Sequence, residues 1–63
     1  MEGTVKWFNP GKGYGFIAGD VGQEYFVHVS ALPEGTVLNE NDKVSFTEAK
    51  TDRGLQARDI EVL

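Results

Sequence analysis

The 63 residues of this chain are enough for one domain, and a domain of this size hides only about 60% of its unfolded surface when it folds. Ten acidic residues against six basic ones give a net charge of −4, which argues against a polyanion partner held by bulk attraction alone. Without cysteine the chain has neither disulfides nor thiolate metal sites, and we expect a cytoplasmic protein that needs no metal or cofactor.

The chain shows no sign of a membrane span or of a second domain. No apolar run approaches the ~18 residues of a transmembrane helix, and the first residues lack the basic start of a signal peptide. There is no internal repeat, low-complexity tract or linker. We therefore expect residues 1–63 to form a single, monomeric domain that does not bind membranes.

The pattern predicts five short strands and almost no helix. Apolar residues nowhere follow helical spacing, and eight glycines are spread along the chain, as expected for many tight turns. In chain order we expect strands at 4–8, 14–18, 25–29, 43–50 and 55–63, with one helical turn over 30–33. Turns at 9–11, 19–22 and 51–54 and a loop from 34 to about 42 connect them. These elements predict an all-β fold, a small five-stranded antiparallel barrel that is closed or partly open.

Alternation along the second and third strands predicts which side chains face outward. On the second strand Tyr14 and Phe16 lie on the same face, and on the third strand Phe26 and His28 lie on the same face, because successive side chains of a strand point to opposite sides of the sheet. An imidazole prefers at least partial solvation, so the face with Phe26 and His28 is expected to be the outer one. The predicted core then contains Ile17, Tyr25 and Val27.

If these two strands pair, their outward side chains form one aromatic patch. A chain of this size has a total stability of only about 3–9 kcal/mol, so aromatic rings left outside the core need a functional reason. Lys6 and Lys12 flank the patch, and residues 1–17 hold two basic residues against one acidic, whereas residues 18–63 hold four against nine. Gly13 and Gly15 are expected to leave room for a flat base between the rings. This combination is typical of proteins that stack unpaired bases of single-stranded nucleic acid.

Four motifs carry a resemblance to a known family. The segment K-G-Y-G-F-I at 12–17 resembles the first ribonucleoprotein motif, and Y-F-V-H at 25–28 the second, in the reverse of their order in RNA-recognition-motif domains. With G-T-V-K-W-F-N at 3–9 and D-R-G-L-Q-A at 52–57, the pattern is similar to that of bacterial cold-shock proteins over essentially the full length. The resemblance implies an oligonucleotide-binding (OB) fold that takes single-stranded RNA and DNA with low sequence selectivity and a preference for pyrimidines. It further implies an RNA chaperone in cold adaptation and in the regulation of gene expression.

The same resemblance implies the site by position. The stacking residues would be Trp7, Phe8, Tyr14, Phe16, Phe26 and His28, with Phe8 a partly buried member of the cluster. Backbone or base-edge contacts would come from Lys6, Asn9, Lys12 and Arg53. Two departures shorten the expected site: Val29 stands where the family usually has an aromatic residue, and the loop at 33–37 is short and lacks a stacking phenylalanine.

Other functions have less support in the residues. His28 is the only histidine, one imidazole without further ligands is no metal site, and no serine or cysteine can be placed beside it. The segment G-K-G at 11–13 lacks the spacing of a phosphate-binding loop, and acids such as Asp20 and Glu24 are expected to be solvated surface. We therefore expect no enzyme. The alternative is a barrel that docks a proline-rich or extended peptide on the same aromatics.

Overall fold

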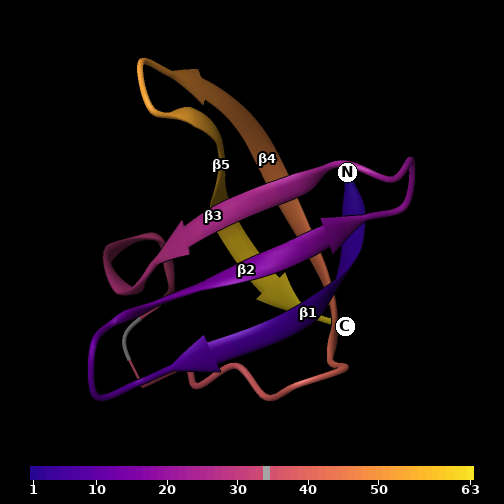
Figure 1. Ribbon diagram of the computed structural model, residues 1–63. Coiled ribbons are helices and arrows are strands. Elements are labelled where there is room, and N and C mark those ends of the chain that lie inside the picture. The colour runs from indigo at the N-terminus through magenta and orange to yellow at the C-terminus, as the bar shows by residue number, and fades with distance from the viewer. Residues whose placement is uncertain (34) are drawn as a thin grey trace.

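The computed structural model describes residues 1–33 and 35–63, which form five strands (Figure 1). The elements are β1 (Glu2–Asn9), β2 (Tyr14–Gly19), β3 (Glu24–His28), the short 3-10 helix η1 (Val29–Ala31), β4 (Lys43–Thr51) and β5 (Gly54–Val62). All five predicted strands are confirmed, each to within two residues at either end. The predicted start of the loop at Glu34 lies outside the described residues.

Strand β3 ends one residue earlier than predicted because His28 caps the helix that follows. Its Nδ1 atom accepts a hydrogen bond from the backbone N–H of Ser30 at 3.1 Å and lies 2.9 Å from the Ser30 hydroxyl. Val29 is therefore the first residue of η1, and its N–H donates to the Gly13 carbonyl at 2.8 Å. The predicted assignment of residue 29 to the strand is wrong.

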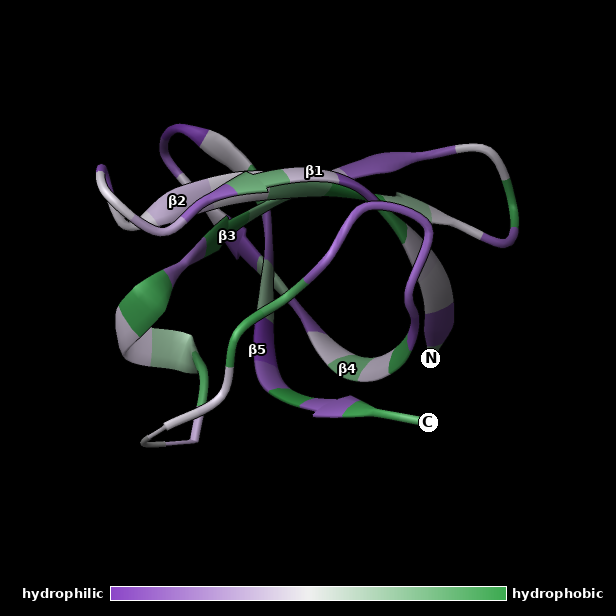
Figure 2. Ribbon diagram, turned by 90° about the horizontal axis from the view of Figure 1, so that it is seen from below, coloured by the Kyte–Doolittle hydropathy of each residue, from purple (hydrophilic) through white to green (hydrophobic). Residues whose placement is uncertain are grey.

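The strands close into a barrel in the order β1-β2-β3-β5-β4. Four of the pairings are antiparallel, and β3 meets β5 in parallel through the single pair Phe26 and Gln56. In Figure 1, β1, β2 and β3 lie side by side with β4 and β5 crossing behind them. Figure 2 shows the first three strands edge-on as one layer, with β4 and β5 curving beneath it. The all-β barrel is thus confirmed, and the layer of β1, β2 and β3 keeps an outer face that no other strand covers.

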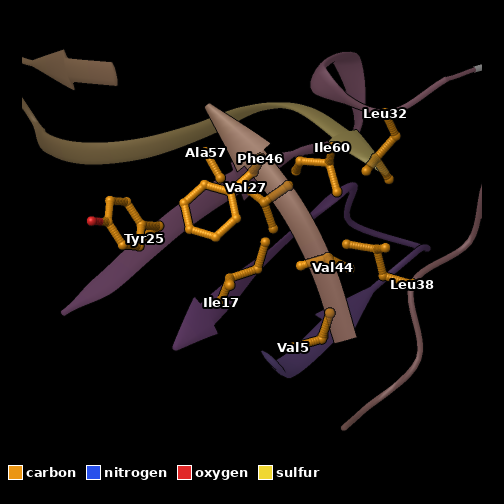
Figure 3. Close-up of a cluster of buried hydrophobic side chains, with 10 residues drawn as sticks. All are labelled: Val5, Ile17, Tyr25, Val27, Leu32, Leu38, Val44, Phe46, Ala57 and Ile60. Atoms are coloured by element: carbon orange, nitrogen blue, oxygen red, sulfur yellow. The ribbon is translucent and has the colours of Figure 1, made fainter. Parts of the chain in front are cut away.

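The hydrophobic core fills the inside of the barrel. Its side chains point toward one another from all five strands and from the connection between β3 and β4 (Figure 3). The buried residues are Val5, Ile17, Tyr25, Val27, Leu32, Leu38, Val44, Phe46, Ala57 and Ile60. The three residues predicted as core from β2 and β3 are each 0% exposed, which confirms the assignment of inner and outer faces on these strands.

Tyr25 buries its ring and turns its hydroxyl away from the rest of the core (Figure 3). The ring centroid lies 4.8 Å from that of Phe46. The hydroxyl donates to Oε2 of Glu48 at 2.7 Å and lies 2.8 Å from Oε1 of Gln23. The hydrogen bond to Glu48, together with burial and the nearby negative charge, raises the pKa of the Tyr25 hydroxyl above its ordinary value.

We expect this hydrogen bond to make part of the stability sensitive to alkali. Because the folded pKa of Tyr25 is above the unfolded value of about 10, its contribution is fully present below about pH 10 and is lost as the pH rises through the folded value. Denaturant unfolding at increasing pH should show this loss in the wild type and a smaller one in Tyr25→Phe. Equal losses in the two proteins would assign the alkaline instability to other groups. Since the chain has two tyrosines, absorbance in a Tyr14→Phe background follows the ionisation of Tyr25 alone.

The part of the chain that the structure describes contains no helix long and apolar enough to cross a membrane. Within residues 1–33 and 35–63, moreover, no three histidine, aspartate or glutamate side chains come together in a group that could hold a metal ion.

Candidate nucleic-acid interface

A β-bulge decides which side chains of β1 face outward. The register between β1 and β2 shifts between Val5 and Trp7, so that Lys6 is an extra residue without a partner on β2. Strict alternation from the buried Val5 would turn Trp7 inward. With the extra residue in place, Trp7 lies opposite Phe16 on the outer face, and Phe8 turns toward the interior.

Four aromatic rings gather on the outer face and touch in a closed circuit, which we call the ring cluster. Its members are Trp7, Tyr14, Phe16 and Phe26. The Trp7 centroid lies 5.8 Å from that of Tyr14 and 5.6 Å from that of Phe16, and the Phe26 centroid lies 5.9 Å and 5.7 Å from the same two rings. These spacings and the tilted or edge-on ring planes are typical of favourable aromatic contacts. The structure therefore brings together four of the six predicted stacking residues.

The rings of the cluster are only partly accessible because they cover one another. Trp7 is 40% exposed, whereas Tyr14, Phe16 and Phe26 are half-buried. Rings that are already packed against one another lose little conformational freedom when a further ring stacks on them, and each base offers such a ring. The arrangement thus provides a preformed platform rather than four independent mobile side chains.

His28 lies on the same face but outside the ring contacts. It is opposite Tyr14 in the β2–β3 register and is exposed to solvent. Its hydrogen bond with the backbone of Ser30 holds the imidazole at the end of β3 while leaving the ring accessible. The structure thus places His28 at the border of the ring cluster, where its stacking role stays a prediction.

Phe8 is not a member of the ring cluster. It lies opposite Gly15 in the register, is half-buried, and packs against the core. Its partial burial agrees with expectation, and its stacking role stays a prediction, but none of the ring contacts found among the described residues includes Phe8. The reason is the bulge at Lys6, which reverses the faces of the two residues that follow it.

The polar residues predicted to contact nucleic acid from β1 and the turn after it differ in whether their side chains already have a partner within the protein. The Lys6 ammonium forms an ion pair with Glu24, with Nζ 2.9 Å from Oε1. Asn9 uses Oδ1 to accept the backbone N–H of Lys12 at 3.1 Å, which stabilises the predicted turn after β1. The Lys12 side chain is exposed, and no ion pair to it is found among the described residues.

A groove of about 340 Å³ runs beside the ring cluster where β3 meets β5. It is lined by Phe16, Glu24, Phe26, Arg53, Leu55 and Gln56. Arg53 reaches it from the turn between β4 and β5, which Thr51 stabilises through Oγ1 by accepting the Arg53 N–H at 3.2 Å and donating to the Gly54 carbonyl at 3.0 Å. The predicted Arg53 therefore lies next to two members of the ring cluster, although it is 37 positions from Phe16 and 27 positions from Phe26 along the chain.

A second groove of about 340 Å³ extends the first toward η1 and shares Gln56 with it. It is lined by His28, Ser30, Ala31, Gln56, Ala57, Arg58 and Asp59. The sequence pattern assigns neither Gln56 nor Glu24 to the site, because isolated polar residues form no pattern and the residues that meet between β3 and β5 are distant in sequence. The only signal for Gln56 is its position in the motif D-R-G-L-Q-A.

Glycine is needed at positions 13 and 15 because of close neighbouring atoms and the local backbone conformation, and not in order to admit a base. A Cβ atom at position 15 would lie 2.7 Å from Cα of Phe8, and at position 13 it would lie 3.2 Å from Cγ1 of Val29. Gly13 also has a φ of +79°, a conformation that side-chain-bearing residues rarely adopt. Both glycines are buried, so the expectation that they leave room for a base between the rings is wrong.

Comparison with known proteins agrees with the barrel. Residues 1–63 match the family described as the 'Cold-shock' DNA-binding domain. The chain belongs to the cold-shock domain family. Members of this family bind nucleic acid and are not enzymes, so nucleic-acid binding is the function of this cold-shock domain at its most general level.

Individual relatives cover nearly the whole cold-shock domain. Cold shock protein 1 of Lactiplantibacillus plantarum is 52% identical over 61 residues, which are 94% of this chain and 92% of the relative. The major cold shock protein CspA of Pseudomonas aeruginosa is 45% identical over 66 aligned positions, covering 100% of this chain and 94% of the relative. The solved structure of drosophila Unr CSD456 matches with a TM-score of 0.73 at 27% identity, covering 98% of this chain and 26% of the other.

Proposed function

We propose that this cold-shock domain binds single-stranded RNA and DNA by stacking unpaired bases on the ring cluster. The observation that carries the proposal is the closed circuit of Trp7, Tyr14, Phe16 and Phe26 on the outer face of β1, β2 and β3. Base stacking on aromatic rings contributes about 1–3 kcal/mol per base, which an acidic protein can use as long as the phosphates pass a locally non-acidic surface. Two basic residues suit the phosphates: Lys12, in the turn that precedes Tyr14, and Arg53, beside Phe16 and Phe26.

The proposed selectivity and role follow from this mode of binding. Every base has a stacking face, so selectivity should be low, and the preference for pyrimidines is taken from the family resemblance. A protein that holds bases unpaired acts against RNA secondary structure, as a cytoplasmic RNA chaperone in cold adaptation and gene-expression regulation would. We propose that it does so as a monomer.

Titration of Trp7 fluorescence tests the proposal directly, because Trp7 is the only tryptophan and lies in the ring cluster. Oligo-dT should quench it at sub-micromolar to micromolar concentrations, and the same strand in a duplex should quench much less. A proline-rich peptide serves as the control for a peptide-binding surface. Quenching by the peptide but not by oligo-dT would overturn the proposed function.

The salt dependence of oligo-dT binding should be shallow. If stacking dominates and about two to four phosphates are neutralised, the slope of log K against log salt concentration is about −1.4 to −2.8, from −0.7 per phosphate on single strands. The slope is measured by repeating the Trp7 titration over a series of salt concentrations. A slope steeper than about −5 would show that charge, and not stacking, provides most of the affinity.

Lengthening the row of rings at Val29 should strengthen binding. Val29 is 46% exposed at the start of η1, next to His28, so a larger side chain there needs no room in the core. We expect Val29→Phe to increase the affinity for oligo-dT by up to ~1 kcal/mol, at the low end of the stacking range. Calorimetry on one oligonucleotide at fixed salt measures the change, and a thermal melt verifies the fold. Weaker or unchanged binding by a folded variant would place the edge of the site elsewhere.

A further inference from the structure

An ion pair on the outer face ties up one of the basic residues predicted to contact phosphate. Lys6 Nζ lies 2.9 Å from Oε1 of Glu24, and the two side chains are 47% and 57% exposed. Lys6 is free to reach across β2 because the bulge leaves it without a partner there, and Glu24 lies opposite the small side chain of Ala18. The pair therefore spans the layer from β1 to β3.

The ion pair borders the ring cluster on the side away from His28. Lys6 directly precedes Trp7, and Glu24 lines the groove that also contains Phe16 and Phe26. A nucleic-acid strand whose bases stack on these rings would bring phosphates within reach of this pair. There the lysine would attract a phosphate, whereas the glutamate would repel it and at the same time occupy the lysine.

We propose that Glu24 limits both the affinity and the salt dependence of nucleic-acid binding by competing with phosphate for Lys6. An ion pair this exposed is weak, so a phosphate can displace the carboxylate, but the displacement lowers the net gain from the new contact. Forming one ion pair at the expense of another also reduces the net number of counterions released. The inference rests on the proposed function, since it concerns single strands bound on the ring cluster.

Glu24→Gln is the variant that tests the competition, because it removes the charge and keeps the shape. Oligo-dT should bind it about two- to fivefold more tightly than the wild type, in line with the weakness of exposed ion pairs. Its salt slope should be steeper by about 0.7, the contribution of one additional neutralised phosphate. Trp7 fluorescence measures both, and thermal melts verify that each variant is folded.

Two further variants separate the competition from a general effect of charge. Asp20→Asn makes the same change in net charge by removing the acid of the other ion pair, in which Lys43 Nζ lies 3.1 Å from Oδ1 of Asp20, outside both grooves. We expect it to leave the affinity and the salt slope unchanged. In a Lys6→Gln background, Glu24→Gln should have no effect on the salt slope, because the lysine for which Glu24 competes is gone.

The outcomes distinguish this inference from the proposed function. If the wild type binds oligo-dT and Glu24→Gln binds it with the same affinity and salt slope, the inference is overturned and the proposed function is kept. An equal gain in Asp20→Asn, or a full gain in the Lys6→Gln background, also overturns the inference, since bulk charge or direct repulsion would then explain the result. Failure of the wild type to bind any single strand overturns the proposed function and the inference with it.

Discussion

Replacing Phe26 by alanine is expected to weaken oligo-dT binding by about 1–3 kcal/mol while the protein stays folded. Phe26 touches two other rings of the cluster, lies opposite Phe16 in the register, and lines the groove next to Arg53. It is half-buried by rings of the outer face and is not part of the core. Its removal therefore takes away stacking surface at the centre of the proposed site. Calorimetry with oligo-dT measures the loss.

The neighbouring residue provides a matched control on the opposite face of β3. Val27 is 0% exposed, and Val27→Ala should lower the free energy of unfolding by about 1–2 kcal/mol, with little change in affinity where the protein is folded. Denaturant unfolding of both variants separates the two effects. If Phe26→Ala lost as much stability as Val27→Ala and bound oligo-dT normally, the ring cluster would be structural and the proposed function would lose its main support.

Gly15→Ala is expected to destabilise the barrel by about 1–3 kcal/mol or more, a large part of the stability of a chain this short. The added methyl group would lie 2.7 Å from Cα and 2.9 Å from Cδ1 of Phe8, and would also contact the carbonyl oxygen of Trp7. Two of these atoms belong to the backbone of β1, so the clash cannot be relieved by a change of side-chain rotamer. The strands β1 and β2 would have to move apart, and the ring cluster spans both of them. Thermal and denaturant unfolding measure the effect.

Gly11→Ala is the control for this prediction. Gly11 is exposed in the turn after β1, and a Cβ atom there would meet only the side-chain oxygen of Asn9, at 3.3 Å. We expect a change of stability within about 0.5 kcal/mol, as is usual at the surface. A folded Gly15→Ala protein of wild-type stability that failed to bind oligo-dT would restore the view that the glycine leaves space for a base.

The sequence was sufficient to predict the outer face of β2 and β3. Alternation puts Tyr14, Phe16 and Phe26 on one side and the buried Ile17 and Val27 on the other, and both strands are short and regular enough for that pattern to hold. The turn at 9–11 is equally local, since an asparagine, a proline and a glycine in succession favour it whatever the rest of the chain does. These two predictions are correct because each depends only on a few neighbouring residues.

The sequence by itself thus determined the five strands, the three core residues of β2 and β3 and most of the aromatic platform, because these follow from side-chain alternation and turn chemistry within each hairpin. Only the tertiary structure decided that Trp7 faces outward and Phe8 inward, since an unpaired residue at the bulge has no signature in the sequence. It likewise decided that Lys6 meets Glu24 and that Gln56 lies beside Phe26. These contacts join strands that are distant along the chain, and closure of the barrel sets the register in which they meet.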